Sequence, residues 1–278
     1  MKIRDILKTT ADRLKKSDID TANLDAKLLL CEYLKKDKLY LIVNGDKDIL
    51  VDDSFEELVK RREALEPMQY ILGKAEFYGL DFKVNKNVLI PRPDTEILVE
   101  SVIDYVGDNQ YTVLDIGTGS GCIPITVTAN CKNAKACTVD ISADATKVAV
   151  DNAKLNGVED RISFLNMDIL KDFPDFKVDC IVSNPPYIED DIIPTLMRDV
   201  KDYEPIIALS GGPDGLVFYR RISQKGFDIL KNGGMIAFEV GHNQSKAVAD
   251  ILKKDGYINV KITNDLAGIG RVVSAIKK

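Results

Sequence analysis

The stretch Val113-Leu114-Asp115-Ile116-Gly117-Thr118-Gly119-Ser120-Gly121 decides the fold. Its first half is an apolar run of strand length, and three glycines follow at alternate positions. Glycine lets the backbone turn sharply and lets a ligand approach without a Cβ in the way. A helix expected from about Cys122 would point its first N–H groups into this loop, where they can hold a carboxylate or phosphate. The pattern differs from the dinucleotide fingerprint Gly-x-Gly-x-x-Gly/Ala, because its third small residue is replaced by Cys122.

Around this loop the sequence predicts strands that alternate with helices. The seven predicted strands are Thr112–Ile116, Ala136–Asp140, Ile162–Leu165, Val178–Val182, Met235–Val240, Asn259–Thr263 and Val272–Ile276. The helices between them include Ala143–Leu155, Leu216–Leu230 and Gln244–Lys254. This alternation indicates an α/β fold with a Rossmann-like, doubly wound seven-stranded sheet. The loop between the last two strands is too short for a crossover helix, so we expect the last strand to be antiparallel.

A different pattern precedes the sheet. Apolar residues recur at helical spacing from residue 1 to about 66, and residues 1–75 hold 15 Lys and Arg against 15 Asp and Glu. A small, neutral N-terminal helical domain over residues 1–73 is therefore expected, and it is either a scaffold or a substrate-recognition domain. Ser54 has capping-box spacing and is predicted to begin a helix.

Residues 74–93 are predicted to form a β-hairpin linker between this domain and a third region, 94–278. The segment from Glu76 to Val84 alternates around Gly79, as in a hairpin. Pro91-Arg92-Pro93-Asp94 follows as a rigid turn, and Asp94 is predicted to cap the next helix.

A second signal stands at the end of the fourth predicted strand, where Ser183-Asn184-Pro185-Pro186-Tyr187 follows Val178–Val182. Two prolines end the strand, because neither has an N–H for the sheet. Ligands of open α/β sheets bind at the carboxyl ends of strands, and the first and fourth strands are neighbours in a doubly wound order. The glycine loop and this segment are therefore expected to line one cleft.

Two acidic residues end neighbouring strands. Asp140 lies 19 residues after Gly121 and is predicted to accept hydrogen bonds from ribose hydroxyls. Its alternative role is a helix N-cap, which Ser142 would serve equally well. Asp168 is placed to meet an adenine amino group or, equally, to cap the turn before Ile169. Asp115 is expected to help order the glycine loop.

Composition excludes several classes of protein. The single histidine, His242, rules out a His-cluster metal site, and the cysteine spacing does not suit zinc, so no metal is predicted. The five cysteines form no CxxC pair and are expected to be free thiols of a cytoplasmic protein. No apolar run approaches the roughly 20 residues of a membrane span, and nothing resembles an export signal. The net charge of −6 disfavours a protein that grips long nucleic acid.

These motifs together resemble the class I S-adenosylmethionine-dependent methyltransferases. A closer similarity is to the peptide chain release factor glutamine methyltransferases. It rests on Glu66–Gly73, Phe77-Tyr78-Gly79, Leu89–Glu96, Asn184–Tyr187, Glu204-Pro205, Gly212–Leu216 and Phe238–Gly241. The resemblance spans nearly the whole chain. One departure is Ile169, where some members carry an aromatic residue against the adenine.

The resemblance implies transfer of a methyl group from S-adenosyl-L-methionine to the side-chain amide of the glutamine in the Gly-Gly-Gln loop of a release factor. It implies cofactor binding by Gly117, Thr118, Gly119, Ser120, Gly121, Asp140, Asp168, Ile169 and Asn184. It implies substrate binding by Asn184, Pro185, Pro186 and Tyr187, with Asn184 and Pro185 as the catalytic residues. The expected partners are release factors, with no stable nucleic-acid or membrane binding, and the chain is expected to be a monomer.

The residue chemistry fits this reaction. An amide nitrogen is a poor nucleophile because its lone pair is delocalised. The Asn184 side-chain oxygen and the Pro185 carbonyl can accept hydrogen bonds from the NH₂ group and turn that lone pair toward the methyl donor. Adenine N6 and guanine N2 are also planar NH₂ groups, so a nucleic-acid methyltransferase is an alternative. A cofactor-binding regulatory protein and an NAD-linked oxidoreductase are further alternatives.

Overall fold

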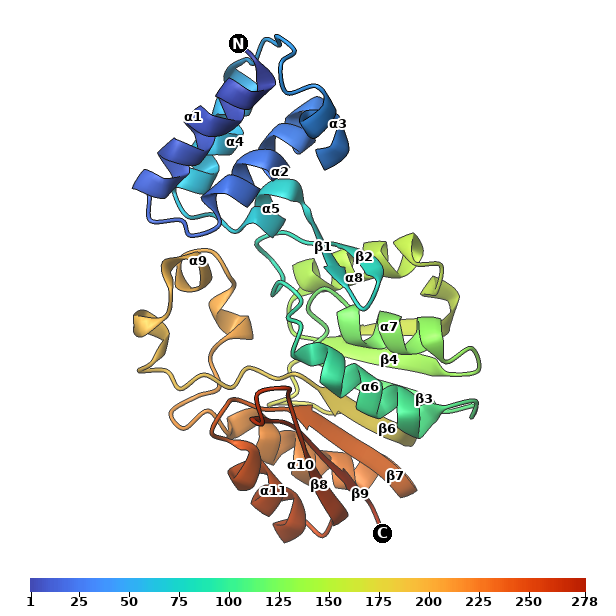
Figure 1. Ribbon diagram of the computed structural model, residues 1–278. Coiled ribbons are helices and arrows are strands. Elements are labelled where there is room, and N and C mark those ends of the chain that lie inside the picture. Colours follow the sequence, from blue (N-terminus) through green and yellow to red (C-terminus); the bar gives the residue numbers. More distant parts are fainter. The chain divides into compact units, whose positions relative to one another are not determined.

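The computed structural model describes all residues, 1–278, and they form two compact units (Figure 1). The first contains residues 1–73 together with 197–203, and the second contains 74–196 and 204–278. The short segment 197–203 thus belongs to the first unit although it lies within the sequence of the second. None of the helices is long and apolar enough to cross a membrane.

The first unit is entirely helical. Its helices are α1 (Ile3–Lys16), α2 (Ala22–Leu34), α3 (Lys38–Val43), α4 (Asp53–Glu63), α5 (Met68–Leu72) and α9 (Arg198–Lys201). The first five bury one apolar core, in which Ile3, Leu14 and Leu29 are inaccessible to solvent. The hydroxyl of Tyr203 donates to the carbonyl of Ala64 over 2.7 Å, which ties the separate segment to this unit.

The helix α4 begins earlier than predicted. Its N-cap is Asp52, whose side chain accepts a hydrogen bond from the Ser54 N–H at 3.0 Å. The Ser54 hydroxyl also donates to the Asp52 side chain, over 2.6 Å. The predicted cap at Ser54 is therefore wrong, because a charged oxygen two residues upstream takes both donors.

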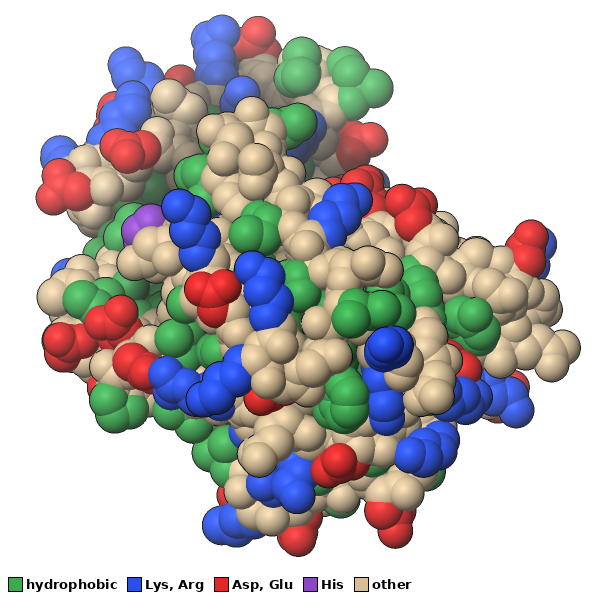
Figure 2. Space-filling view, turned by 90° about the horizontal axis from the view of Figure 1, so that it is seen from below, with side chains coloured by type: hydrophobic (Ala, Val, Ile, Leu, Met, Phe, Trp, Pro, Cys, Tyr) green, Lys and Arg blue, Asp and Glu red, His purple; other side chains and the backbone are tan.

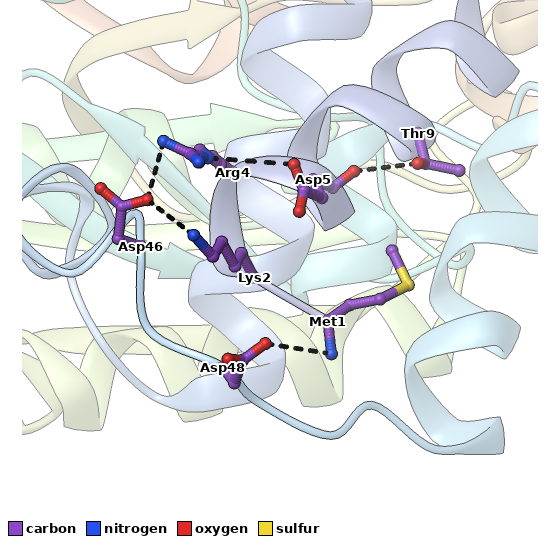
Figure 3. A network of polar contacts seen from close by, with 7 residues as sticks. All are labelled: Met1, Lys2, Arg4, Asp5, Thr9, Asp46 and Asp48. Carbon is purple, nitrogen blue, oxygen red and sulfur yellow. Dashed lines mark hydrogen bonds and ion pairs between the residues drawn. The ribbon is translucent and has the colours of Figure 1, made fainter.

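Polar contacts hold the N-terminus against the loop that follows α3 (Figure 3). The Asp46 side chain pairs with Lys2 at 3.3 Å and with Arg4 at 2.7 Å, and the terminal ammonium lies 3.7 Å from Asp48. These partners are exposed, so we expect each pair to contribute at most about 1 kcal/mol to stability.

The second unit contains the predicted seven-stranded sheet. Its strands are β3 (Thr112–Ile116), β4 (Lys135–Asp140), β5 (Ile162–Asn166), β6 (Val178–Ser183), β7 (Leu230–Glu239), β8 (Ile258–Asn264) and β9 (Gly270–Ile276). Their order is β5-β4-β3-β6-β7-β9-β8. Only β9 runs antiparallel to its neighbours β7 and β8. The predicted fold class is confirmed.

Helices cover both faces of this sheet (Figure 1). One face carries α6 (Thr95–Val106), α7 (Cys122–Asn130) and α8 (Ala143–Leu155), and the other carries α10 (Val217–Ile229) and α11 (Ser245–Lys254). Each face buries its own apolar cluster, because both sides of a parallel sheet need cover. Short 3₁₀ helices are η1 (Glu159–Arg161), η2 (Ile193–Thr195) and η3 (Ile206–Ala208).

The hairpin predicted as a linker consists of β1 (Lys74–Phe77) and β2 (Leu80–Lys83). Its rings Phe77 and Phe82 are buried in the cluster beneath α6 and α7, and they meet edge to face at 6.1 Å. Asn152 of α8 donates to the carbonyl of Lys83 and accepts from its N–H. The hairpin is thus part of the second unit in the structure.

Candidate active site

The glycine loop leaves β3 in a conformation that only glycine adopts readily. Gly117, Gly119 and Gly121 have φ values of +86°, +53° and +82°. The N–H groups of Gly117 and Thr118 both donate to the Val139 carbonyl, at 2.9 and 3.3 Å. These bonds tie the loop to the end of β4, so its shape is fixed by backbone groups.

A buried side-chain network supports the loop from below. Thr138 donates to an Asp115 carboxyl oxygen at 2.6 Å and lies in hydrogen-bond contact with the Thr118 hydroxyl. Asp115 is fully buried, and burial raises its pKa to about 7. Its other oxygen, Oδ1, has no hydrogen-bond partner. Asp115 therefore helps to order the loop, as expected, through Thr138.

Asp140 connects the loop to α8. Its Oδ2 accepts from the Gly119 N–H at 2.9 Å and its Oδ1 accepts from the Ser142 N–H at 2.8 Å. Burial raises the pKa of this carboxyl, and the two N–H donors oppose the rise. Ser142 itself caps α8, because its hydroxyl accepts from the Ala145 N–H. The capping role considered for Asp140 thus falls to Ser142, and the ribose-binding role remains a prediction.

Asn184 and the two prolines after it stand beside the glycine loop, because β6 pairs with β3. The Ser183 hydroxyl donates to the Ile116 carbonyl over 2.5 Å and joins the two strand ends. A Cβ on Gly117 would lie 3.7 Å from the Asn184 carbonyl oxygen. The two sequence signals thus converge at one edge of the sheet, as the doubly wound order predicts.

The segment around Tyr187 is packed from behind by residues far along the chain. Gln244 donates to the Tyr187 carbonyl at 2.9 Å. A Cβ on Gly211 would lie 2.7 Å from the Tyr187 Cα, and one on Gly215 would lie 2.4 Å from its carbonyl oxygen. Burial raises the pKa of the Tyr187 hydroxyl to about 12, so it is neutral at physiological pH. This close packing makes the segment stiff.

The glycine loop and the segment from Asn184 to Pro186 both line one cavity. Its volume of about 560 Å³ is within the range of small-molecule sites. Of the residues predicted for the site, those that line it are Gly117, Thr118, Gly119, Ser120, Asp140, Asp168, Ile169, Asn184, Pro185 and Pro186. Gly121 and Tyr187 do not line it. Gly121 is a packing position, because a Cβ there would lie 2.8 Å from the Ile125 side chain.

Asp168 lines the cavity and also orders the turn that follows it. Its Oδ1 accepts from the Leu170 N–H at 3.0 Å, and Lys171 lies 3.0 Å from Oδ2. The hydrogen bond with Lys171 lowers the pKa of this carboxyl, so it is ionised. The structure therefore contains the turn-capping contact, and the contact to an adenine remains a prediction.

Several residues that line the cavity are not predicted from the sequence as site residues. Arg92, Thr95 and Phe218 line the cavity, as do Ile206 and Ile207, which are more than half exposed. Phe218 is the second residue after the Gly-Leu pair of the Gly212–Leu216 motif, so that motif is the available signal. Phe218 supplies an aromatic wall in the same cavity as Ile169.

Asp94 has a different role from the one predicted. Its side chain makes no cap bond to α6. It instead lies 3.1 Å from Arg271 of β9, which also pairs with Asp265 at 3.0 Å. The predicted cap is wrong, because a cation 177 residues away in sequence (271 − 94) competes for the carboxylate.

Comparison with known proteins identifies the family. The model "PrmC N-terminal domain" matches residues 5–73, and the model "Methyltransferase small domain" matches residues 93–198. The release factor glutamine methyltransferase of Clostridium acetobutylicum is 43% identical over 100% of this chain and 99% of its own length. The one from Clostridium botulinum is 42% identical over 100% of both chains. This chain belongs to the release factor glutamine methyltransferases.

A solved structure supports the fold of this release factor glutamine methyltransferase family member. The catalytic domain of hMettl16, in complex with an RNA hairpin of the MAT2A 3′UTR, superposes with a TM-score of 0.59 at 18% identity. The match covers 84% of each chain. At this identity the match shows a shared fold and nothing more.

Proposed function

We propose that this protein transfers a methyl group from S-adenosyl-L-methionine to the side-chain amide nitrogen of the glutamine in the Gly-Gly-Gln motif of translation release factors. One observation carries the proposal: a single cavity is lined both by the glycine loop and by Asn184 and Pro185. A methyl donor and a planar NH₂ group bound there would meet at the sheet edge.

The residues of the cavity suit the cofactor. Its volume of about 560 Å³ is ample for a nucleoside with an amino-acid tail. The glycine loop leaves room for a ligand at Gly119, because no atom lies within 4 Å of the position that a Cβ would take there. Asp140 would hold the ribose, the loop the methionine portion, and Asp168, Ile169 and Phe218 the adenine.

When bound, the cofactor would supply an electrophilic methyl on a sulfonium: transfer would form a nitrogen–carbon bond, break a sulfur–carbon bond and release one amide proton to solvent. The chain contributes alignment. The Asn184 side-chain oxygen and the Pro185 carbonyl accept hydrogen bonds from the NH₂ group and fix the direction of its lone pair. The Pro185 carbonyl is held in place because two prolines and the packing behind Tyr187 keep this segment stiff.

The surface charge favours a protein substrate over nucleic acid. Figure 2 shows one face of the molecule, on which basic side chains are interrupted by acidic and apolar ones. This face offers no continuous basic track of the kind that nucleic-acid enzymes present. We assign recognition of the release factor to the N-terminal helical domain, residues 1–73, and we expect the enzyme to act as a monomer in the cytoplasm.

A radiolabel experiment tests the proposal. The enzyme is incubated with methyl-tritiated cofactor and, in separate reactions, with a release factor, the same release factor with its Gly-Gly-Gln glutamine changed to alanine, and a mixed oligonucleotide pool. Label is expected on the unaltered release factor alone. Label on the oligonucleotides, or equal label on the altered release factor, would contradict the proposal.

A further inference from the structure

A buried carboxyl lies behind Asn184. Glu239 ends β7 with only 3% of its surface exposed, and its Oε2 has no hydrogen-bond partner. Thr95, the first residue of α6, is 2% exposed. Its hydroxyl oxygen accepts a hydrogen bond from Asn184 Nδ2 at 3.3 Å. Hydrogen bonding from Thr95 and Asn184 favours the ionised form of the Glu239 carboxyl and opposes the rise in its pKa that burial causes.

We propose that Glu239, acting through Thr95, is a positioning residue that keeps the side-chain oxygen of Asn184 turned toward the substrate nitrogen. The inference rests on the proposed function. An asparagine amide has a donor end and an acceptor end, and half a turn about its last torsion exchanges them. Only the acceptor end serves an NH₂ group, so the direction of Asn184 decides whether the site works.

The direction follows from counting hydrogens. An ionised carboxylate only accepts hydrogen bonds, and a hydroxyl has a single hydrogen to donate. Glu239 draws the Thr95 hydrogen to itself, which leaves an oxygen lone pair of Thr95 facing Asn184. Only the NH₂ end of Asn184 can bind there, so its oxygen faces the cavity.

Protonation of Glu239 would reverse this chain of hydrogen bonds. A protonated carboxyl donates to Thr95, whose hydroxyl is then free to donate to the Asn184 oxygen and stabilise the flipped amide. The charged and titratable groups near Glu239 are Asp94, Arg271, Tyr187, Tyr219 and Cys122. Asp94 disfavours the ionised carboxylate, and Arg271 favours it.

The balance of these influences sets the working pH. Burial raises the pKa of Glu239 to about 7, and hydrogen bonding to Thr95 opposes the rise. The ionised, orienting form therefore predominates above this value and is lost as pH falls through it. The turnover number is expected to rise with pH through about 7, while cofactor affinity, which we assign mainly to the glycine loop and Asp140, changes little.

The test compares four variants with the wild type: Glu239→Gln, Thr95→Val, Thr95→Ser and, as matched control, Glu96→Gln. Glu96 follows Thr95 on α6, and its carboxylate accepts from the Tyr78 N–H. Turnover with a release factor is measured from about pH 5.5 to 9, and cofactor affinity by calorimetry. Glu239→Gln and Thr95→Val are each expected to lower turnover about tenfold at pH 8, with cofactor affinity within about twofold of wild type. Both should also flatten the acid limb of the pH profile, which is the fall in turnover as pH drops through about 7.

Three further readouts separate orientation from simple support of the fold. The double variant is expected to be no slower than either single one, because both substitutions break the same chain of hydrogen bonds. Thr95→Ser keeps the hydroxyl and should restore most of the turnover, and Glu96→Gln should keep the acid limb. In the cofactor-free protein, ¹³C NMR of labelled glutamate should show one carboxyl that titrates near pH 7 and is missing from Glu239→Gln.

The inference is overturned if Glu239→Gln keeps both the wild-type turnover and the acid limb. It is also overturned if cofactor affinity falls in parallel with turnover, or if no glutamate titrates near pH 7. Failure of the proposed function looks different, because the wild type would then transfer no methyl group to a release factor at any pH. That result would contradict both the proposed function and the role of Glu239.

Discussion

Two parts of the cavity lining, called the cofactor end and the acceptor end, are built in different ways. The cofactor end is a backbone loop whose shape is fixed by hydrogen bonds: the N–H groups of Gly117 and Thr118 donate to the Val139 carbonyl of β4, and that of Gly119 donates to Asp140. The acceptor end depends on how one side-chain amide, that of Asn184, is turned. Each end rests on a buried carboxyl with a raised pKa and one unpartnered oxygen, Asp115 or Glu239.

This difference separates binding from turnover. A loop whose shape is fixed by internal hydrogen bonds and glycine conformations binds a ligand equally well before and during reaction. An oriented acceptor matters most when the nitrogen lone pair must point at the methyl carbon, so its contribution is to the transition state. Substitutions at the two ends should therefore change different kinetic constants.

The largest expected effect is that of Asn184→Ala. Removal of an oriented hydrogen-bonding group in an active site typically lowers turnover by about 10² to 10³-fold. Cofactor affinity should stay within about threefold of the wild type, because the cradle of the cofactor end is intact. Turnover is measured with a release factor, and affinity by calorimetry. Equal losses in both would show that the two ends are not separable.

The converse result is expected of Asp140→Asn. Its carboxylate accepts from the N–H groups of Gly119 and Ser142 and is predicted to bind the ribose. Loss of charge-assisted hydrogen bonds costs about 1.5–3 kcal/mol, so the dissociation constant for the cofactor should rise roughly 10- to 100-fold. Turnover at saturating cofactor should fall far less. A turnover defect with unchanged cofactor affinity would show that Asp140 does not act mainly through cofactor binding.

Stability should depend on pH through Asp115. Its pKa is raised from 3.8 to about 7 by burial, so the folded protein keeps a proton that the unfolded chain has lost. The free energy of unfolding should therefore fall as pH rises between about 4 and 7, by at most about 1.4 kcal/mol per pH unit from this group. Asp115→Asn should flatten that slope in urea unfolding series. A slope that is unchanged in the variant would contradict the assignment.

The smallest expected effect is a difference in stability between alanine substitutions at two glycines of one loop. Alanine at Gly119 or Gly121 must adopt a positive φ, which costs roughly 1–2 kcal/mol. A Cβ at Gly121 also lies 2.8 Å from Ile125, whereas nothing lies within 4 Å of one at Gly119. Gly121→Ala should thus be less stable than Gly119→Ala by about 1 kcal/mol in thermal unfolding. The reverse order would show that Gly119 has a packing role.

Sequence reasoning predicted the cofactor end better than the acceptor end, for a physical reason. The glycine loop and Asp140 belong to consecutive strands, and their positions follow from local backbone rules and a standard strand order. The strands themselves follow from continuous apolar runs such as Val178–Val182. These features can be read within a window of some 30 residues.

What escaped prediction depends on contacts between distant residues. Glu239, Thr95 and Asn184 come from three separate elements, and no spacing rule brings them together. Arg271 draws Asp94 away from its expected cap, and Phe218 enters the cavity from a helix beyond the site motifs. The cap at Ser54 was wrong by two residues, because Asp52 and Ser54 are both good N-cap residues and their competition is settled by local geometry.

The central claim is that the donor and a glutamine amide meet in this one cavity, and tandem mass spectrometry of a release factor tests it most directly. After incubation with enzyme and cofactor, the account predicts one added methyl group, on the side-chain nitrogen of the Gly-Gly-Gln glutamine, and none after incubation with Asn184→Ala for the same time. A methyl group on any other residue, or full methylation by Asn184→Ala, would contradict it.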